Sequence, residues 1–491
     1  MFGVAMSRAI TSVSVARARA AGFEMLWLTN HARVLAIRKR PTVICAELRN
    51  RDTLATHFKN LTVSHSPGLV ITVVPEQGSI PPGGKLQIEL HIVPRRVGYH
   101  GIHSLTLHTI VAPGLFTVPL AFSNPFVVDV AAEAGQLSVN FAGRGHNRAQ
   151  SQHTVLGPRR GESLELKELR EHQAGDPYRR IAWKASARRG KLMVIDREAE
   201  THEAAWILLD LSTDSASGQL GDAALDRAVD CAQRLITVHQ KRGDALGLAL
   251  FGNRLLAAHA PERSVHHYSK LRHALVHGAH TADQDRSDWD EADVAQKVLE
   301  HARALDRDCV TLTTHEYDLL VERARAVMKR APVRATEAWA PREADQLLRN
   351  YLLSFGIQPP PRTTSDRIQT ELQMASFIFE LCQKRRTCSV VSVLGRPPTL
   401  DTPKQLMDAF AWSRRRHISV HFYPMVDLTV PKDQNREGAA SMTSLKTRVA
   451  SDALFHRQRL ATEDGIVELV KLGVRVQSSL VQRLPSGGPG P

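Results

Sequence analysis

The stretch Ala204-Ala205-Trp206-Ile207-Leu208-Leu209-Asp210-Leu211-Ser212-Thr213-Asp214 decides how the larger part of this chain folds. Its apolar run from Ala204 to Leu211 predicts a strand buried on both faces, as in a parallel sheet covered by helices. Carboxylates and a hydroxyl follow where the strand turns into a loop. In such sheets ligands bind outside the carboxyl ends of the strands, so we expect this loop to border a crevice.

Strand and helix patterns alternate after this stretch. Asp222 to Lys241 has apolar residues at helical spacing, and residues 463–472 predict another helix. Further strands are predicted at 245–251, 389–394, 418–423 and 473–477. Strands separated by helices favour a mostly parallel, doubly wound α/β domain, here over residues 201–480. A helix-rich region at about 281–387 is too long for a simple crossover and predicts a helical insertion.

Upstream of the α/β domain the pattern is typical of an all-β unit. Short apolar or alternating runs between residues 41 and 132 are separated by turns such as Ser66-Pro67-Gly68. This spacing predicts an immunoglobulin-like β-sandwich. Residues 1–40 are expected to form an N-terminal arm or helix, 133–200 a polar bridge, and 481–491 a disordered tail.

The amino-acid composition limits the kinds of molecule that this protein is expected to bind. The 491 residues suit two or three domains, and the net charge of +14 favours acidic protein surfaces, anionic lipid or nucleic acid. Aromatic residues make up only 5%, which leaves little for base stacking, so nucleic-acid binding is not expected. The five cysteines have neither zinc-site nor redox-pair spacing and suit a reducing compartment. No run of about 18 apolar residues occurs, so we expect a cytoplasmic protein.

A dense motif lies in the bridge, Gly175-Asp176-Pro177-Tyr178-Arg179-Arg180-Ile181-Ala182-Trp183-Lys184-Ala185-Ser186-Ala187-Arg188. One interpretation is structural: Asp176, Arg180 and Arg188 form an ion-pair network that docks the sandwich onto the α/β domain, with the Trp183 ring buried. The other interpretation is that the motif contacts a partner directly. The two are compatible.

This motif resembles the signature of a bacterial family called domain of unknown function 58, whose members are similar to von Willebrand factor A domains. The matching positions include Gly175, Asp176, Arg180, Trp183, Ser186, Arg188 and Glu198. The resemblance implies an accessory protein that serves a MoxR-type AAA+ ATPase as a substrate adaptor. Many members carry N-terminal membrane helices; this chain has no such segment, which leaves at most a peripheral position at the inner membrane.

The resemblance also implies a metal-ion-dependent adhesion site. Its ligands here would be Asp210, Ser212, Asp214 and Thr281, with Mg²⁺ or Mn²⁺ as the ion. The site is degenerate, because Asp214 replaces a serine and Val393-Leu394-Gly395 stands where a further aspartate is expected, with Asp401 the nearest substitute. The alternative is that Asp210 and Asp214 only cap the loop and the following helix.

Motifs for catalysis are absent from the sequence. It contains no phosphate-binding glycine loop ending in Lys-Ser/Thr and no nucleophile elbow. Together with what the resemblance implies, this leads us to expect a non-catalytic adaptor that binds a MoxR-type ATPase or its client protein through the crevice around Asp210, in assembly or maturation of protein complexes. One alternative is a metal-dependent hydrolase whose ion is held by Asp210, Asp214 and Asp401 and activates water. Another is a module that binds an anionic membrane surface.

Overall fold

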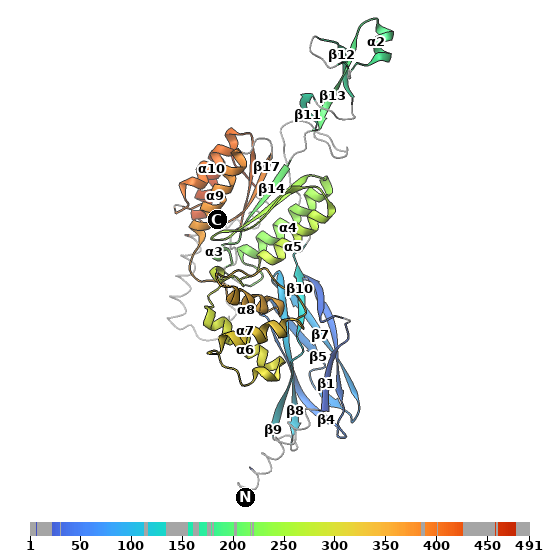
Figure 1. Cartoon of the computed structure of the whole chain (residues 1–491), viewed down its shortest axis with the longest axis vertical. Helices are drawn as coiled ribbons and strands as arrows, with labels where there is room; N and C mark the ends of the chain where they lie inside the picture. Colours follow the sequence, from blue (N-terminus) through green and yellow to red (C-terminus); the bar gives the residue numbers. More distant parts are fainter. Residues whose placement is uncertain are drawn as a thin grey trace, which may run out of the picture.

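The computed structural model describes the chain in separate stretches. They are 22–29, 31–111, 116–133, 156–160, 166–173, 181–200, 204–216, 220–383, 388–399, 401–425 and 460–477, with the single residues 6, 178, 218 and 457. The fold is mixed α/β with a β-rich N-terminal part, and a slender arm projects from the end of the α/β part that lies away from the β-rich part (Figure 1). Among the described helices, none has the length and apolar character needed to cross a bilayer.

Two sheets that share one core form the N-terminal part, which is consistent with an immunoglobulin-like sandwich. The first has the order β1-β3-β7-β5, and the second β2-β10-β8-β4-β6 with β9 paired to β8. The strands are β1 (Phe23–Trp27), β2 (Arg33–Ile37), β3 (Thr42–Asn50), β4 (Thr56–His65), β5 (Leu69–Val74), β6 (Gly78–Ile80), β7 (Lys85–Pro94), β8 (Gly98–Val111), β9 (Phe116–Phe122) and β10 (Phe126–Ala131). Alternate residues such as Ile44, Leu90 and Leu107 fill the space between the sheets.

The sandwich begins earlier than the sequence predicted. Strands β1 and β2 lie within the expected N-terminal arm of residues 1–40, so this prediction was wrong for residues 23–37. Strand β1 pairs antiparallel with β3, and β2 pairs parallel with β10. Each of these strands has five residues and lies at the edge of its sheet, so a single neighbouring strand supplies its hydrogen bonds. Such short edge strands leave little periodic signal.

The α/β part contains a six-stranded sheet with the order β16-β15-β14-β17-β18-β19, parallel except for the edge strand β16. Its strands are β14 (Ala204–Asp210), β15 (Ala245–Phe251), β16 (Leu255–Glu262), β17 (Val390–Gly395), β18 (Ser419–Pro424) and β19 (Arg475–Val476). Five strands match those predicted near 204–211, 245–251, 389–394, 418–423 and 473–477. The sequence did not predict β16, whose half-exposed pattern lacks a continuous apolar run.

Helices cover both faces of this sheet, as the apolar run in β14 predicted. The covering helices are α4 (Ala224–Arg242), α5 (Val265–Gly278), α9 (Arg367–Gln383) and α10 (Lys404–Arg415). Ile207 and Leu209 share a core with α4 and α5, whereas Trp206 and Leu208 share one with α9 and α10. Successive side chains of a strand point to opposite faces, so β14 needs apolar residues at nearly every position.

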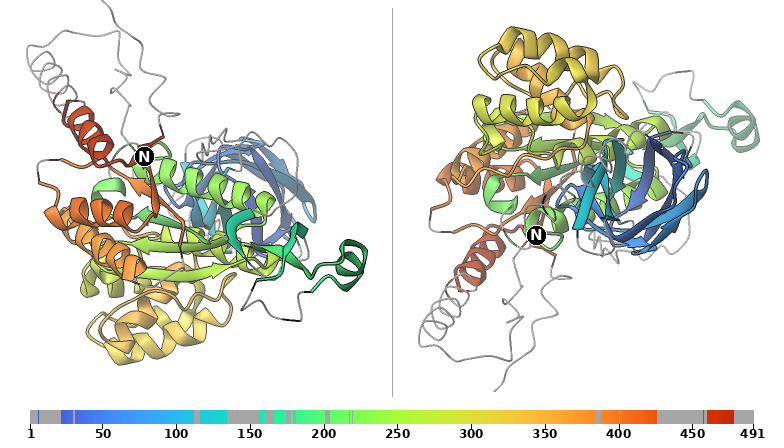
Figure 2. Two further views of the ribbon diagram at one scale, coloured as in Figure 1. Left: turned by 90° about the horizontal axis from the view of Figure 1, so that it is seen from above. Right: turned by 90° about the horizontal axis from the view of Figure 1, so that it is seen from below.

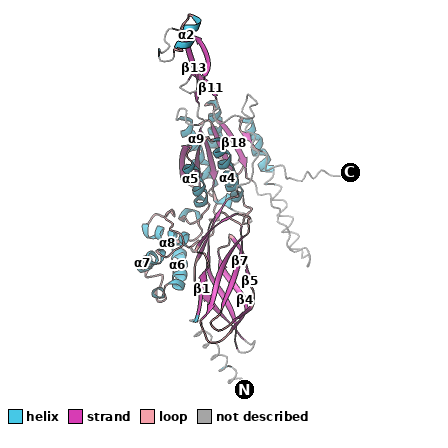
Figure 3. Ribbon diagram, turned by 90° about the vertical axis from the view of Figure 1, so that its right-hand side faces the viewer, coloured by secondary structure: helices cyan, strands magenta, loops and turns pink. Residues whose placement is uncertain are grey.

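The helical insertion is shorter than the predicted range of 281–387. Helices α6 (Glu291–Leu305), α7 (Tyr317–Met328) and α8 (Glu343–Ser354) pack around their own core of residues such as Val298 and Leu348. They lie beside the sandwich (Figures 1 and 3), where the Gly101 amide of β8 donates to the Gly356 carbonyl at 3.0 Å. Helix α9 instead buries Met374 against the sheet, so it belongs to the doubly wound layer.

The predicted bridge contains a small folded arm. Strands β11 (Leu156–Arg160), β12 (Leu166–Glu171) and β13 (Met193–Glu200) form an antiparallel sheet of order β11-β13-β12, and α2 (Trp183–Arg189) lies at its tip. The arm also stands clear of the other parts when the molecule is viewed along its long axis (Figure 2). The predicted tail at 481–491 lies outside the described residues.

Candidate functional site

Asp210 ends β14, the central strand of the sheet, at the edge where the sequence predicted a crevice. Its Oδ1 accepts a hydrogen bond from the Ser212 amide at 2.8 Å, and its Oδ2 accepts one from the Ser215 hydroxyl at 2.8 Å. The Ser212 hydroxyl in turn donates to the Ser215 hydroxyl at 3.1 Å. All three residues are buried. Both Asp210 oxygens therefore hold the loop that leads into the short helix α3 (Thr213–Ala216).

Two further carboxylates that the sequence did not predict lie near this loop, at the start of α9. Asp366 accepts hydrogen bonds from the Thr213 amide at 2.8 Å and the Thr213 hydroxyl at 2.9 Å. Glu371 accepts one from the Arg367 guanidinium at 2.8 Å. Burial raises the pKa of both carboxyl groups, and the charge of Asp210 raises each pKa further. Asp366 and Glu371 lie far from Asp210 in the sequence, and no sequence pattern links them to it.

The predicted metal ligands make several different hydrogen bonds. Asp214 accepts a hydrogen bond from the Ser365 hydroxyl at 2.6 Å, and the Thr281 hydroxyl donates to the Pro359 carbonyl at 2.7 Å. Asp210 and Ser212 of the predicted set share one hydrogen-bonded cluster. Within the described residues, no group of three or more His, Cys, Asp or Glu side chains is placed to hold a metal.

Two buried carboxylate oxygens near Asp210, Asp366 Oδ2 and Glu371 Oε2, have no hydrogen-bond partner among the described residues. Burial and the charge of Asp210 raise the pKa of both carboxyl groups, because both effects disfavour the ionised form. The metal-dependent hydrolase stays a prediction. A Cβ at Gly395, the position of the expected further aspartate, would lie 3.0 Å from the Asp210 Cβ.

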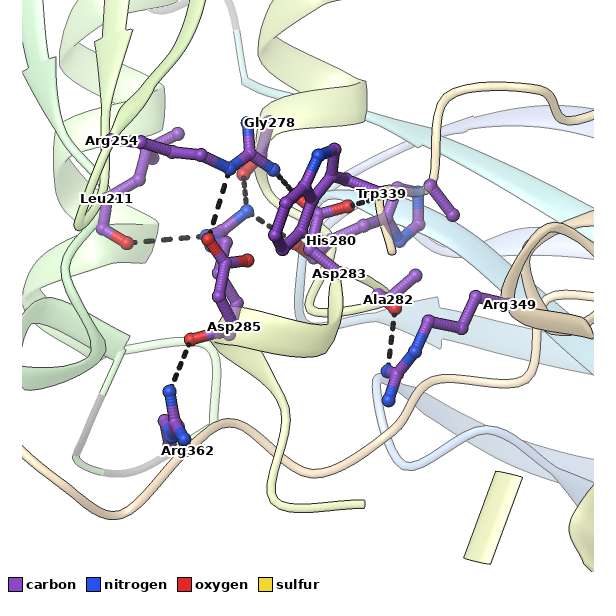
Figure 4. Close-up of polar contacts among 12 residues, drawn as sticks. Leu211, Arg254, Gly278, His280, Ala282, Asp283, Asp285, Trp339, Arg349 and Arg362 are labelled. Carbon is purple, nitrogen blue, oxygen red and sulfur yellow. Dashed lines mark hydrogen bonds and ion pairs between the residues drawn. The ribbon is translucent and has the colours of Figure 1, made fainter. Parts of the chain in front are cut away.

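Arg286 joins the end of β14 to the end of α5. Its guanidinium donates to the Leu211 carbonyl at 3.3 Å, to the Gly278 carbonyl at 3.0 Å and to the His280 carbonyl at 2.6 Å; Figure 4 labels these three partners. Burial lowers the Arg286 pKa, and the nearby Asp283 carboxylate opposes that effect. The sequence did not mark this arginine, because its partners are backbone carbonyls from distant segments. It fixes the loop that follows Asp210.

Arg254 connects the hairpin of β15 and β16 to the segment that leads into the insertion. Its guanidinium lies 2.8 Å from Asp283 and 3.0 Å from Asp285. The same group stacks over the Trp339 ring, 4.8 Å from its centroid, as Figure 4 shows from the side. The hairpin and the insertion are therefore held together by charge and by an aromatic contact.

The signature motif lies on the arm, and the structure describes only part of it. Gly175, Asp176 and Arg180, as well as the Glu198 side chain, fall outside the described residues. Trp183 is 65% exposed, so the prediction of a buried indole was wrong. A seven-residue helix on a three-stranded sheet buries only one narrow face, and Trp183 lies off that face.

Ser186 and Arg188 have different roles in the arm. The Ser186 hydroxyl donates to the Ala182 carbonyl at 3.0 Å and accepts from the Met193 amide at 2.8 Å, which fixes α2 on β13. Arg188 is exposed at the end of α2. It is not part of the ion pairs that dock the sandwich, contrary to the structural interpretation. Among the described residues, those pairs are made by Arg38, Lys39 and Arg96, with Asp230, Asp222 and Asp226 as their partners.

Comparison with known proteins gives one family match. Residues 168–347 match the family model described as "Protein of unknown function DUF58". This stretch includes the described part of the signature motif, the Asp210 loop and most of the insertion. The family match agrees with the resemblance seen in the sequence. No curated protein matches the chain.

Several solved structures match parts of the chain. They include a PapD-like domain of human CEP192 (12% identity, 23% of this chain and 87% of that chain, TM-score 0.19). Another is SSP-19 of Caenorhabditis elegans, an MSP-domain protein (14% identity, 20% and 94% covered, TM-score 0.16). A third is a protein of unknown function from Porphyromonas gingivalis W83 (12% identity, 28% and 55% covered, TM-score 0.17). Likenesses at these scores carry no functional argument.

Proposed function

We propose that this chain is a non-catalytic adaptor that works with a MoxR-type AAA+ ATPase in chaperone-like assembly or maturation of protein complexes. The family match over residues 168–347, together with the signature motif, supports this proposal. The observation that carries it is the contrast between the two candidate sites. The polar groups around Asp210 form hydrogen bonds within the loop that follows β14. At the tip of the arm, by contrast, the large aromatic side chain of Trp183 is exposed.

The tip of the arm has the composition of a protein-binding surface. Trp183 is 65% exposed and Leu192 45% exposed, and Lys184, Arg188 and Arg189 lie on the same short helix as Trp183. Within the described part of the chain, these three cations form no ion pair. Tryptophan and arginine are enriched among the residues that dominate binding energy at interfaces. We therefore propose an acidic, partly apolar surface on the ATPase or its client as the partner.

The order of the six-stranded sheet supports a finer description of the α/β part. The sheet has five parallel strands, β14 among them, and one antiparallel edge strand, β16. We propose that this part is a von Willebrand factor A-like domain whose adhesion-site loop has become a hydrogen-bonded structural loop. Its role would be to serve as the structural support for the arm and the insertion. A cytoplasmic location is part of the same proposal.

Crosslinked capture from the native host tests the adaptor proposal. The full chain and its Trp183→Ala variant would be compared with a matched control, Trp412→Ala, whose indole is 37% exposed on α10. We expect an AAA+ protein to be captured by the full chain and by the control, and to be depleted at least tenfold with Trp183→Ala. Capture that is equal with all three proteins would exclude the arm as the contact. Failure to capture any AAA+ protein would contradict the proposal as a whole.

A further inference from the structure

A cavity of about 400 Å³ lies between α5, the hairpin of β15 and β16, and the helical insertion. Its walls come from Leu250 and Leu256 of the hairpin, Lys270 and Ala274 of α5, and Leu353 of α8. Cavities of about 300–1,000 Å³ are the size that takes small-molecule ligands. The cavity does not include Asp210 or the arm.

Lys270 supplies an uncommitted positive charge at one end of this cavity. It lies three residues before His273 and seven before His277, so the three side chains share one face of α5. His259 of β16 lines the cavity opposite that face. Burial lowers the His259 pKa, and the nearby His267 and Lys270 lower it further. Lys270 is exposed and makes no ion pair with any residue that the structure describes.

The acidic groups of the cavity already have partners. Asp283 receives a hydrogen bond from Arg254 at 2.8 Å and another from the Trp339 amide at 2.8 Å. Glu337 Oε2 accepts from the Thr336 amide at 2.9 Å, while its Oε1 lies 3.8 Å from His277 Nε2. The other cation of the wall, Arg286, is buried and donates to three carbonyls. Lys270 is therefore the exposed cation of the wall that a ligand can contact.

Part of the cavity wall is apolar and closely packed, while the wall also includes His273, His277, His280 and Arg286. Leu250 is almost fully buried, and Leu256 and Ala274 pack against the same core. A Cβ placed on Gly278, the last residue of α5, would lie 2.7 Å from the Leu250 Cδ1. The helix therefore approaches the sheet as closely as a glycine allows. The open volume lies over a firm apolar floor rather than in a loosely packed region.

We infer that this cavity binds a small organic anion with an apolar body, such as a short-chain carboxylate. The anionic group lies between the Lys270 ammonium and the His259 ring, because an imidazole N–H can donate to an anion without carrying charge itself. The apolar body covers Leu250, Leu256 and Ala274. This inference does not rest on the adaptor proposal.

A ligand in this position touches parts of the chain that are far apart in sequence. Besides α5 and β16, it reaches Leu353 in α8. The same helix face contacts the sandwich, because the Tyr99 hydroxyl lies 3.5 Å from His273 Nε2 and 3.3 Å from His277 Nε2. Binding to the native state alone stabilises a protein by mass action, so occupation should raise the unfolding midpoint of the chain.

Calorimetric titration of the full chain with hexanoate, hexan-1-ol, hexylammonium and inorganic phosphate at constant ionic strength tests this inference. We expect saturable binding of one hexanoate per chain, with each of the other probes at least tenfold weaker. Lys270→Met keeps most of the apolar stem but removes the charge, and should weaken hexanoate at least tenfold. Lys471→Met, another exposed lysine, is the matched control and should bind as the unaltered chain does.

A second variant tests the place of binding. Ala274→Leu fills part of the cavity and should weaken hexanoate without removing any charge. Thermal unfolding of each variant without ligand identifies any loss of folding. The inference is overturned if hexanoate does not saturate, if Lys270→Met binds it unchanged, or if hexylammonium binds as well. Phosphate that binds as tightly as hexanoate would show that the apolar wall has no part in recognition.

Discussion

Arg38 of the sandwich and Asp230 of helix α4 form a buried ion pair that joins the two largest parts of the chain. The Arg38 Nε donates to Asp230 Oδ1 at 3.0 Å, and its Nη1 donates to the Gly221 carbonyl at 2.6 Å. Arg38 is only 1% exposed. One helical turn earlier, Asp226 accepts from Arg96 at 3.2 Å. Two arginines of the sandwich thus form ion pairs with one face of α4.

Asp230→Ala should destabilise the chain strongly. The substitution leaves the Arg38 guanidinium buried without its counter-charge, which costs about 3–5 kcal/mol in comparable cases. The free energy of unfolding would be measured by urea denaturation. As a control, Asp308→Ala removes the exposed partner of Arg323 and should cost less than about 1 kcal/mol. Equal, small effects for both variants would mean that the sandwich does not depend on the buried pair.

Stability should fall as the solution is acidified below pH 6.5. Burial lowers the pKa of His100 to about 4, of His103 to about 4 and of His301 to about 3, from the ordinary 6.5. The unfolded chain therefore binds more protons than the folded chain between pH 6.5 and those lower values. Stability is complete above pH 6.5 and is lost as pH falls toward 4, by about 1.4 kcal/mol per pH unit for each proton.

His103→Leu should make this pH dependence shallower. Its Nδ1 is buried without a partner, and its ring packs edge-on against His301 at 5.7 Å. The substitution removes one titrating group from the contact between sandwich and insertion. Urea midpoints between pH 7.5 and 4.5 would show the change, whereas His315→Leu, at an exposed position, should leave the profile as it is. An unchanged slope with His103→Leu would contradict the assignment.

Two tryptophans should respond in opposite ways to truncation. Trp183 is 65% exposed on the arm, so Trp183→Ala should change the free energy of unfolding by no more than about 0.5 kcal/mol. Trp206 is 6% exposed in β14 and packs edge-on against Phe377 at 5.1 Å. Trp206→Ala should therefore cost about 3–5 kcal/mol. A comparable loss from Trp183→Ala would mean that the arm buries its indole in solution.

Asp210 should behave as a structural residue rather than a metal ligand. Asp210→Ala leaves the Ser212 amide and the Ser215 hydroxyl without their acceptor, at a cost of about 1–3 kcal/mol for an unsatisfied buried group. Calorimetric titration of the unaltered chain with Mg²⁺ or Mn²⁺ should give no saturable heat. Saturable binding that Asp210→Ala abolishes would support the adhesion-site interpretation and would make the metal-dependent hydrolase a candidate function again.

Local pattern was enough to predict the central strands. The apolar run that ends at Asp210 predicted a strand covered on both faces, and the structure divides its side chains between two cores. The same reasoning failed for β1, β2 and β16, which lie at sheet edges or are half exposed. Edge strands depend on a neighbour for their hydrogen bonds, and a sequence window does not contain that neighbour.

The sequence by itself determined the order of the main elements, the alternation that produces a doubly wound sheet, and the place of the Asp210 loop at its edge. Only the tertiary structure decided which side chains meet. It brought Asp366 and Glu371 close to Asp210. It also paired Arg38 with Asp230 and left the Trp183 side chain exposed on the arm. The physical reason is that periodicity depends on residues next to each other in the chain. Charge pairs and burial depend instead on contacts between segments that are more than a hundred residues apart.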